Sequence, residues 1–297
     1  MVIIMTRIIK KAPAKINLFL EVSARRPDGY HDIESVMQTV SLFDELTFVI
    51  KEGTGQNISV ECSVPDVPRD ERNLCYRAAK LFFEAADVKM YDLSISIDKH
   101  IPMAAGLGGG SSDAAATLAA LNELYNGVFS KSELCALARK IGADVPFCIM
   151  QGISITKGIG DVFLPCAPLP DCHIVIACRG EGISTPAAYK KLDEMYDFSA
   201  RSVDAGEFAA LIETGELPAI ANGMTNIFES AVLPHHAEAR EIKDILSSTG
   251  ALRAMMSGSG PSVFGIFETE SLAQSAQRAL FDRGIPSHLC KPYYPES

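Results

Sequence analysis

A glycine-rich segment between an expected strand and an expected helix constrains the fold of this chain most. Residues 99–112 read Lys-His-Ile-Pro-Met-Ala-Ala-Gly-Leu-Gly-Gly-Gly-Ser-Ser. The alternating run Tyr91–Asp98 predicts a strand before it, and an Ala/Leu-rich run from Ser111 to about Tyr125 predicts a helix after it. Glycines at such a junction let the backbone approach a ligand without a Cβ atom in the way, and a helix N-terminus favours anions. The segment therefore predicts a phosphate-binding loop, and a merely flexible loop is the alternative.

Two familiar phosphate loops do not fit this segment. A Walker loop has a Lys-Ser or Lys-Thr pair after its last glycine, and none follows Gly110. The dinucleotide-binding pattern needs a third glycine where Ser111 stands. A hydroxyl of Ser111 or Ser112 can instead cap the helix and reach a Mg²⁺ ion that arrives bound to phosphate. Either serine satisfies this interpretation.

Strands and helices mix along the rest of the chain without regular alternation. Strand-like runs cover Thr6–Lys11, Lys15–Ala24 and Ser35–Val49. An apolar stripe over 73–86 predicts a helix that Asn73 caps. A capping box, Ser130–Glu133, opens another helix that runs to Ile141. Further strands and helices are expected over His173–Cys178, Pro186–Tyr196, Ala205–Thr214, Ala237–Ser248, Ser262–Phe267, Ser271–Arg283 and Ser287–Lys291. The mixture favours an α+β fold.

The length of the chain predicts two lobes. With 297 residues it is longer than most single domains, and 47% of the residues are hydrophobic, so each lobe can bury a core. Three prolines and two glycines gather in residues 158–170, a composition typical of a boundary. We therefore expect an N-terminal lobe over residues 1–160 and a C-terminal lobe over residues 161–297.

Charge, cysteines and the N-terminus exclude several classes of partner. The net charge of −10 disfavours nucleic acid, because a phosphate backbone would be repelled. The apolar run near Met1 is too short for a signal peptide or a membrane helix. The eight cysteines include no CxxC pair, which is typical of reduced packing residues and argues against a protein metal cage. We expect a cytoplasmic protein without nucleic-acid or membrane partners, and its oligomeric state stays open.

Three further segments carry residues with possible chemistry. A second glycine loop, Met256–Ser262, is either a hairpin turn or, paired with the first loop, the opposite wall of a phosphate site. Lys15 lies near a strand start, where a lysine is usually a solvated charge. Asp144 lies at an expected helix exit among apolar residues, where an aspartate is often a cap or turn residue.

In their order and spacing these segments resemble one superfamily of small-molecule kinases. The matching residues are PAKINL at 13–18, GLGGGSSDAA at 106–115, GADVPF at 142–147 and MSGSGPS at 256–262. They are similar to the galactokinase, homoserine kinase, mevalonate kinase and phosphomevalonate kinase superfamily, and the match extends from Ala12 to Phe267. The additional PDGYH at 27–31 resembles the branch whose acceptor is a cytidine-diphosphate-linked methylerythritol of the non-mevalonate isoprenoid route.

The resemblance implies a fold and a set of site residues. It implies two α+β lobes with ATP and the acceptor in a cleft between them, and Mg²⁺ brought with ATP. Lys15 and Asp144 would be catalytic. The ATP site would include Asn73, Leu74, Lys99, Pro102, Met103, Ala104, Ala105, Gly106, Leu107, Gly108, Gly109, Gly110, Ser111 and Ser112. The acceptor site would include Asn17, Tyr30, His31 and Tyr189, with the rings of His31 and Tyr189 on opposite faces of the cytosine and Tyr189 contributed by the other lobe.

The implied mechanism is phosphoryl transfer, in which positioning and charge stabilisation dominate. Asp144 would accept or orient the proton of the acceptor hydroxyl, and Lys15 would keep Asp144 ionised. A sister kinase acting on mevalonate, homoserine or a sugar is one alternative. A non-catalytic ligand sensor on the same fold is another, although a sensor would not need both Lys15 and Asp144.

Overall fold

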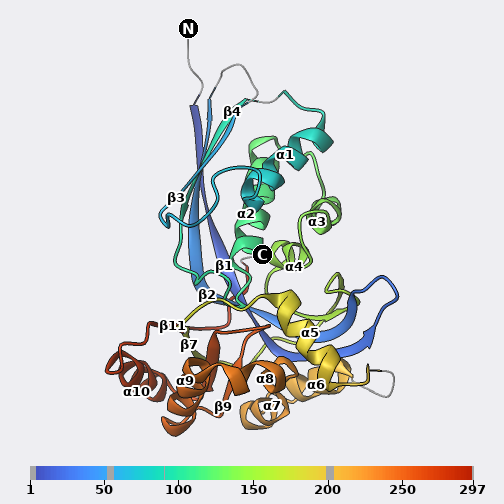
Figure 1. Cartoon of the computed structure of the whole chain (residues 1–297). Coiled ribbons are helices and arrows are strands. Elements are labelled where there is room, and N and C mark those ends of the chain that lie inside the picture. Colours follow the sequence, from blue (N-terminus) through green and yellow to red (C-terminus); the bar gives the residue numbers. More distant parts are fainter. Residues whose placement is uncertain (1–4, 52–56, 90, 199–203, 296–297) are drawn as a thin grey trace. The chain divides into compact units, whose positions relative to one another are not determined.

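A computed structural model describes residues 5–51, 57–89, 91–198 and 204–295 (Figure 1). The chain divides into two compact units. Unit one consists of Met1–Ala14, Leu42–Ile101 and Gly108–Met150, and unit two of Lys15–Ser41, Pro102–Leu107 and Gln151–Ser297. This division differs from a single boundary at residue 160, because Lys15–Ser41 groups with the C-terminal half of the chain. The functions expected of the two lobes stay predictions.

Unit one combines part of a sheet with helices that pack on it (Figure 1). Its strands, in the order β3-β4-β2-β1, are β3 (Ile58–Cys62), β4 (Asp92–Asp98) and the adjoining parts of β2 (His31–Lys51) and β1 (Met5–Arg25). Its helices are α1 (Leu74–Ala86), α2 (Gly109–Leu124), α3 (Lys131–Arg139) and α4 (Val145–Met150). Phe48 and Leu93 from the sheet and Phe82 from α1 belong to one buried apolar cluster, which fixes the helices on the sheet.

Two helix starts in unit one follow from local hydrogen bonds that the sequence predicts. Asn73 caps α1, because its side-chain oxygen accepts from the backbone N–H of Cys75 at 2.8 Å. Ser130 and Glu133 form a capping box at α3, in which each side chain accepts from the backbone of the other. Both predictions are confirmed.

Unit two contains a four-stranded antiparallel sheet in the order β11-β7-β10-β9. The strands are β7 (His173–Ala177), β9 (Arg253–Met256), β10 (Val263–Phe267) and β11 (Ser287–Cys290). All residues of β7 and β10 are buried, because α9 (Ala237–Ser248) and α10 (Glu270–Phe281) pack on this sheet. The remaining elements are β5 (Ile153–Lys157), β6 (Val162–Leu164), α5 (Thr185–Met195), α6 (Ala205–Glu213), α7 (Leu217–Gly223), β8 (Thr225–Asn226), α8 (Phe228–Val232) and the 3₁₀ turn Leu233–His235.

The structure differs from the sequence expectations in several elements. The two expected strands at the N-terminus form one strand, β1, because the φ of Pro13 is compatible with extended backbone. Short elements were missed, namely α4, α7, α8, β3, β5, β6, β8 and β9. In the part of the chain that the structure describes, no helix has the length and apolar character needed to cross a membrane.

Candidate functional site

The first glycine segment has the strand, glycine and helix order that the sequence predicts. It follows β4, and α2 begins at Gly109, two residues before the expected start. Gly106 and Gly108 have φ values of 78° and 70°, a region that favours glycine, and Gly108 is the N-cap of α2. Ala104 also lies in this region, with φ of 49°. Residues with a Cβ atom rarely adopt this conformation, because the Cβ atom makes it sterically unfavourable. Such strain is concentrated at functional sites.

The next two glycines differ in the space around them. A Cβ atom on Gly109 would lie 3.0 Å from Cγ2 of Ile101 and 3.1 Å from Nζ of Lys99. A Cβ atom on the exposed Gly110 would meet only Cδ1 of Leu74, at an ordinary 3.7 Å. The packing of the protein therefore explains glycine at Gly109, but it does not explain glycine at Gly110. A ligand that approaches the backbone would explain it.

The N-terminal part of α2 also holds buried oxygen atoms without a partner. Ser112 is 1% exposed, and its Oγ has no hydrogen bond. Oδ1 of the neighbouring Asp113 is likewise buried and unpaired. A buried polar atom without a partner costs about 1–3 kcal/mol, so such an atom at a helix N-terminus indicates a group that binds from outside. Ser111, the other candidate, is half-buried.

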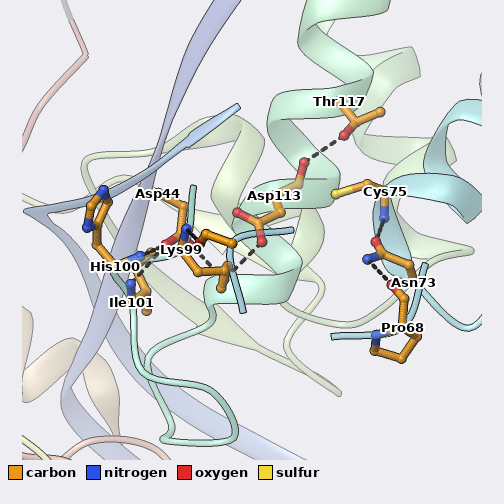
Figure 2. A network of polar contacts seen from close by, with 10 residues as sticks. Asp44, Pro68, Asn73, Cys75, Lys99, His100, Ile101, Asp113 and Thr117 are labelled. Carbon is orange, nitrogen blue, oxygen red and sulfur yellow. Dashed lines mark hydrogen bonds and ion pairs between the residues drawn. The ribbon is translucent and has the colours of Figure 1, made fainter. Parts of the chain in front are cut away.

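A buried ion network lies behind this part of α2. Nζ of Lys99 lies 2.5 Å from Oδ2 of Asp44 and 2.9 Å from Oδ2 of Asp113 (Figure 2). Burial raises the pKa of Asp113 to about 7, although Lys99 opposes the shift. Burial alone would lower the pKa of Lys99, but the charges of Asp113 and Asp44 outweigh burial and raise it. The contact of Lys99 with a nucleotide stays a prediction.

The two residues expected at the adenine lie at the start of α1. Asn73 uses its oxygen for the cap, and its Nδ2 donates to the carbonyl of Pro68 at 2.7 Å. The side chain is therefore held by its own turn. Leu74 is the neighbour of Gly110 described above, so the structure brings the start of α1 to the start of α2. Their role at adenine stays a prediction.

In unit two, Lys15 begins a chain of hydrogen bonds instead of extending into solvent. Lys15 is 5% exposed, so the interpretation of a solvated lysine is wrong. Its Nζ donates to Oδ1 of Asn17 at 2.8 Å, and Nδ2 of Asn17 donates to Oγ of Ser35 at 2.9 Å. Ser35 donates in turn to the carbonyl of Phe19 at 2.6 Å. The chain fixes which end of the Asn17 amide faces Lys15.

The second glycine loop is a hairpin turn that also packs against the first loop. It joins β9 to β10, with Val263 opposite Met256. Oγ of Ser257 donates to the carbonyl of Gly106 at 3.0 Å, and a Cβ on Gly106 would lie 2.0 Å from the carbonyl oxygen of Ser257. Only glycine fits there.

Three more hydrogen bonds hold Lys15 and the hairpin in place. The backbone N–H of Lys15 donates to the carbonyl of Leu107 at 2.9 Å, and its Nζ would lie 3.5 Å from a Cβ on Gly258. The buried Asn226 donates to the carbonyls of Met256 and Gly258, at 2.7 and 2.9 Å. Three sequence motifs thus meet within unit two. In the segment between them, Ala105 and Leu107 are buried, whereas Met103 and Ala104 are exposed and Pro102 is half-buried.

Asp144 lies at a helix entrance, not at the expected helix exit. It directly precedes α4, and its carbonyl accepts from the backbone N–H of Cys148 at 3.1 Å. The side chain is half-buried in unit one. The pairing of Asp144 with Lys15, which belongs to unit two, stays a prediction.

The residues expected at cytidine gather in unit two, but not as the expected clamp. His31 and Tyr189 stack on each other, with ring centroids 4.6 Å apart and planes at 20°. A base between two rings needs a spacing of about 7–8 Å, twice the carbon contact distance. In this structure the two rings therefore leave no room for a base between them. Both rings belong to unit two, whereas Tyr189 was expected from the other lobe. The edge of Phe198 also contacts His31.

The surroundings of His31 fix its ring. Nε2 lies 2.7 Å from Oδ1 of Asp193, and Oδ2 of Asp193 lies 3.7 Å from Arg25. His31 is 8% exposed, whereas Tyr30 is 63% exposed after the expected turn, where Gly29 has φ of 87°. Of these two neighbours, Tyr30 therefore carries the ring that is open to a ligand.

Sequence reasoning missed the side chains that bond the predicted residues. They are Asp44 and Asp113 beside Lys99, Ser35 beside Asn17, Asp193 beside His31, and Asn226 beneath the second glycine loop. One signal was present: Asp113 precedes three alanines, and an aspartate inside so apolar a helix needs a buried partner. The others carry no local signal.

Comparisons with known proteins agree with these motifs. The model of the GHMP kinases N terminal domain matches residues 73–152, and that of the GHMP kinases C terminal region matches residues 208–285. A 4-diphosphocytidyl-2-C-methyl-D-erythritol kinase of Lachnoclostridium phytofermentans is 40% identical over 92% of this chain and 91% of its own. One of Exiguobacterium sibiricum is 42% identical over 92% and 93%. A solved structure of 4-(cytidine 5'-diphospho)-2C-methyl-D-erythritol kinase, 31% identical, matches with a TM-score of 0.79 over 97% of this chain and all of that one.

Proposed function

Because this chain belongs to the 4-diphosphocytidyl-2-C-methyl-D-erythritol kinase family of the GHMP kinases, we infer that it transfers the γ-phosphate of ATP to the 2-hydroxyl of that cytidyl polyol. It is an ATP-dependent phosphotransferase with an alcohol acceptor, in the non-mevalonate route to isoprenoid precursors. The identity to the named kinases over nine-tenths of the chain carries this conclusion. An ATP-consumption assay that compares the cytidyl polyol with mevalonate, homoserine and galactose tests it. Turnover of mevalonate, homoserine or galactose alone would contradict it.

We place the ATP phosphates at the first glycine segment and the start of α2. The open space at Gly110 and the unpaired Oγ of Ser112 support this placement. Backbone N–H groups at the helix N-terminus can hold phosphate oxygens even though the chain carries a net charge of −10. Leu74, beside Gly110, would then lie near the nucleotide.

Ser112 is also the serine that fits Mg²⁺ better. Mg²⁺ prefers oxygen ligands and arrives with the phosphates, so it needs few ligands from the protein. A buried hydroxyl without a partner, such as that of Ser112, suits this role. The ion would neutralise charge on the phosphates when bound.

The location of the protein in the cytoplasm stays a prediction, which rests on the cysteines and on the N-terminal sequence.

We propose that Lys15 and Asp144 both act on the acceptor hydroxyl. Lys15 is oriented by Asn17, whose own amide is fixed by Ser35. Such a preorganised ammonium can stabilise an oxygen that gains negative charge without reorganisation during the reaction. Asp144 would accept or orient the proton of the hydroxyl. The catalytic role of both residues rests on the family motifs and on the buried, bonded state of Lys15.

For the cytidine end we propose stacking on Tyr30, with His31 and Tyr189 as a fixed pair beside it. Replacing Tyr30 by alanine is expected to raise KM for the cytidyl polyol about tenfold or more, because stacking of a base on an aromatic ring contributes about 1–3 kcal/mol. His31→Ala and Tyr189→Ala should each raise it several-fold. Since these two rings stack on each other, the double variant should lose less than the product of the single losses.

The matched readout is KM for ATP, which should stay near the wild-type value in all these variants. Free CMP should compete with the acceptor and not with ATP. Competition of CMP with ATP alone, or a normal acceptor KM in the Tyr30 variant, would remove cytidine from this position.

A further inference from the structure

Lys99 joins the two ends of the glycine segment within unit one. Its chain position is directly after β4, where the segment begins, and its Nζ reaches Asp113 of α2, the residue that follows the segment. The same Nζ bonds Asp44 of β2 (Figure 2). All three side chains are at most 5% exposed. A buried charge without a partner is costly, so breaking either of these ion pairs would strongly destabilise the folded protein.

Asp44 holds the backbone as well as the ammonium. Its Oδ1 accepts from the backbone N–H groups of His100 and Ile101, at 2.6 and 2.8 Å, and its Oδ2 accepts from Lys99. Ile101 in turn supports Gly109, whose missing Cβ would lie 3.0 Å from it. Asp44 therefore fixes the start of the segment, and Lys99 passes this constraint to its end.

We propose that Asp44, Lys99 and Asp113 form a brace whose task is to hold the glycine segment in its ATP-binding conformation, so that Lys99 acts through the loop and not as a cation on the phosphates. The proposal rests on the assignment of ATP to this loop. The ammonium group of Lys99 already bonds the carboxylates of Asp44 and Asp113. A loop that is ordered before the ligand arrives loses less conformational entropy when the ligand binds. The three are thus positioning residues for ATP.

Replacing Asp113 by alanine separates the brace from direct contact, because the two predict opposite signs. At pH 8, above the pKa of about 7 that burial gives Asp113, the change removes a negative charge and leaves the ammonium of Lys99 with one carboxylate fewer. If Lys99 contacted ATP, affinity for ATP should stay the same or increase. If the brace holds the loop, the affinity should fall about tenfold, while KM for the cytidyl polyol stays within about twofold, as the loss of one charged hydrogen bond would give.

The measurement is calorimetric binding of ATP to the full chain, with EDTA present so that metal contacts do not enter the result. Lys99→Met should weaken binding to a similar degree, and the two changes together should be clearly less than additive. Asp113→Asn keeps an oxygen that can accept from Lys99, so it should recover much of the affinity. Glu123→Gln is the matched control, because Glu123 lies on the same helix and pairs with Lys10 at 2.5 Å far along it.

Unchanged or tighter ATP binding by Asp113→Ala would overturn the brace. So would a loss of binding in Lys99→Met alone, since Lys99 would then be a direct ligand. A loss in Glu123→Gln equal to that in Asp113→Ala would reduce the effect to general destabilisation and overturn it too. Gly110→Ala tests the loop itself. If this variant binds ATP normally, the proposed ATP site is wrong. If Gly110→Ala loses ATP binding but Asp113→Ala and Lys99→Met do not, the ATP site stands and only the brace is wrong.

Discussion

Replacing Asp144 by asparagine is expected to slow phosphoryl transfer by about 10²–10⁴-fold while the affinity for ATP changes little. Asparagine has the size of aspartate but cannot take the proton of the acceptor hydroxyl. Lys15→Ala is expected to have a similar effect, because the buried ammonium is held by Asn17 and would be missing when charge develops on the acceptor oxygen. Removing the second member of a pair that acts as one unit costs little more, so the double variant should be far less impaired than the product of the single effects.

The measurement is kcat in single-turnover experiments at saturating ATP and acceptor, with ATP affinity from calorimetry. Lys291 and Asp171 supply a matched control, since they form a Lys–Asp pair that is mostly exposed, at 3.5 Å. Lys291→Ala and Asp171→Asn should leave kcat unchanged, as exposed pairs contribute about 0–1 kcal/mol at most. If the Lys15 and Asp144 losses multiply in the double variant, the two residues do not act as a unit and the mechanism is wrong.

The sequence predicts those elements that are determined by interactions between residues close to one another in the chain. Asn73 caps α1 through a bond two residues away, and the capping box of α3 spans three residues, so both can be read without knowledge of the fold. The helix expected over Ala237–Ser248 is α9 with the same bounds, because its apolar stripe fills several turns. By contrast, α4 has six residues, too few for a helical period to appear, and tertiary packing decides its conformation.

In the candidate site, too, local features could be predicted from the sequence, whereas contacts between distant residues could not. Glycine positions and the strand before them are local, and they predict a phosphate loop. The partners that hold Lys99 are not local: Asp44 is 55 residues away, and it lies in a strand that the periodicity predicts without indicating its neighbours. The stacking of His31 on Tyr189 likewise depends on side-chain packing between distant segments, so a clamp and a stacked pair are equally compatible with the sequence.

Replacing Gly110 by alanine is expected to weaken ATP binding by about 10–100-fold without loss of folding stability. The new Cβ atom would meet only Leu74, at an ordinary contact distance of 3.7 Å, and the position is helical and exposed. Alanine in place of glycine within a helix usually stabilises it by about 0.5–1 kcal/mol. The melting temperature should therefore stay the same or rise. A loss of affinity for ATP together with unchanged or greater stability can only come from the ligand that the methyl group obstructs.

Gly109 supplies the contrast that makes this measurement decisive. A Cβ atom there would lie 3.0 Å from Ile101, so Gly109→Val should lower the melting temperature along with ATP affinity. Calorimetric titration with ATP and thermal unfolding of both variants separate the two causes. If Gly110→Ala binds ATP as tightly as the wild type, phosphate does not approach the backbone at Gly110. The open space there would then need another explanation, and the ATP site would have to lie elsewhere in the chain.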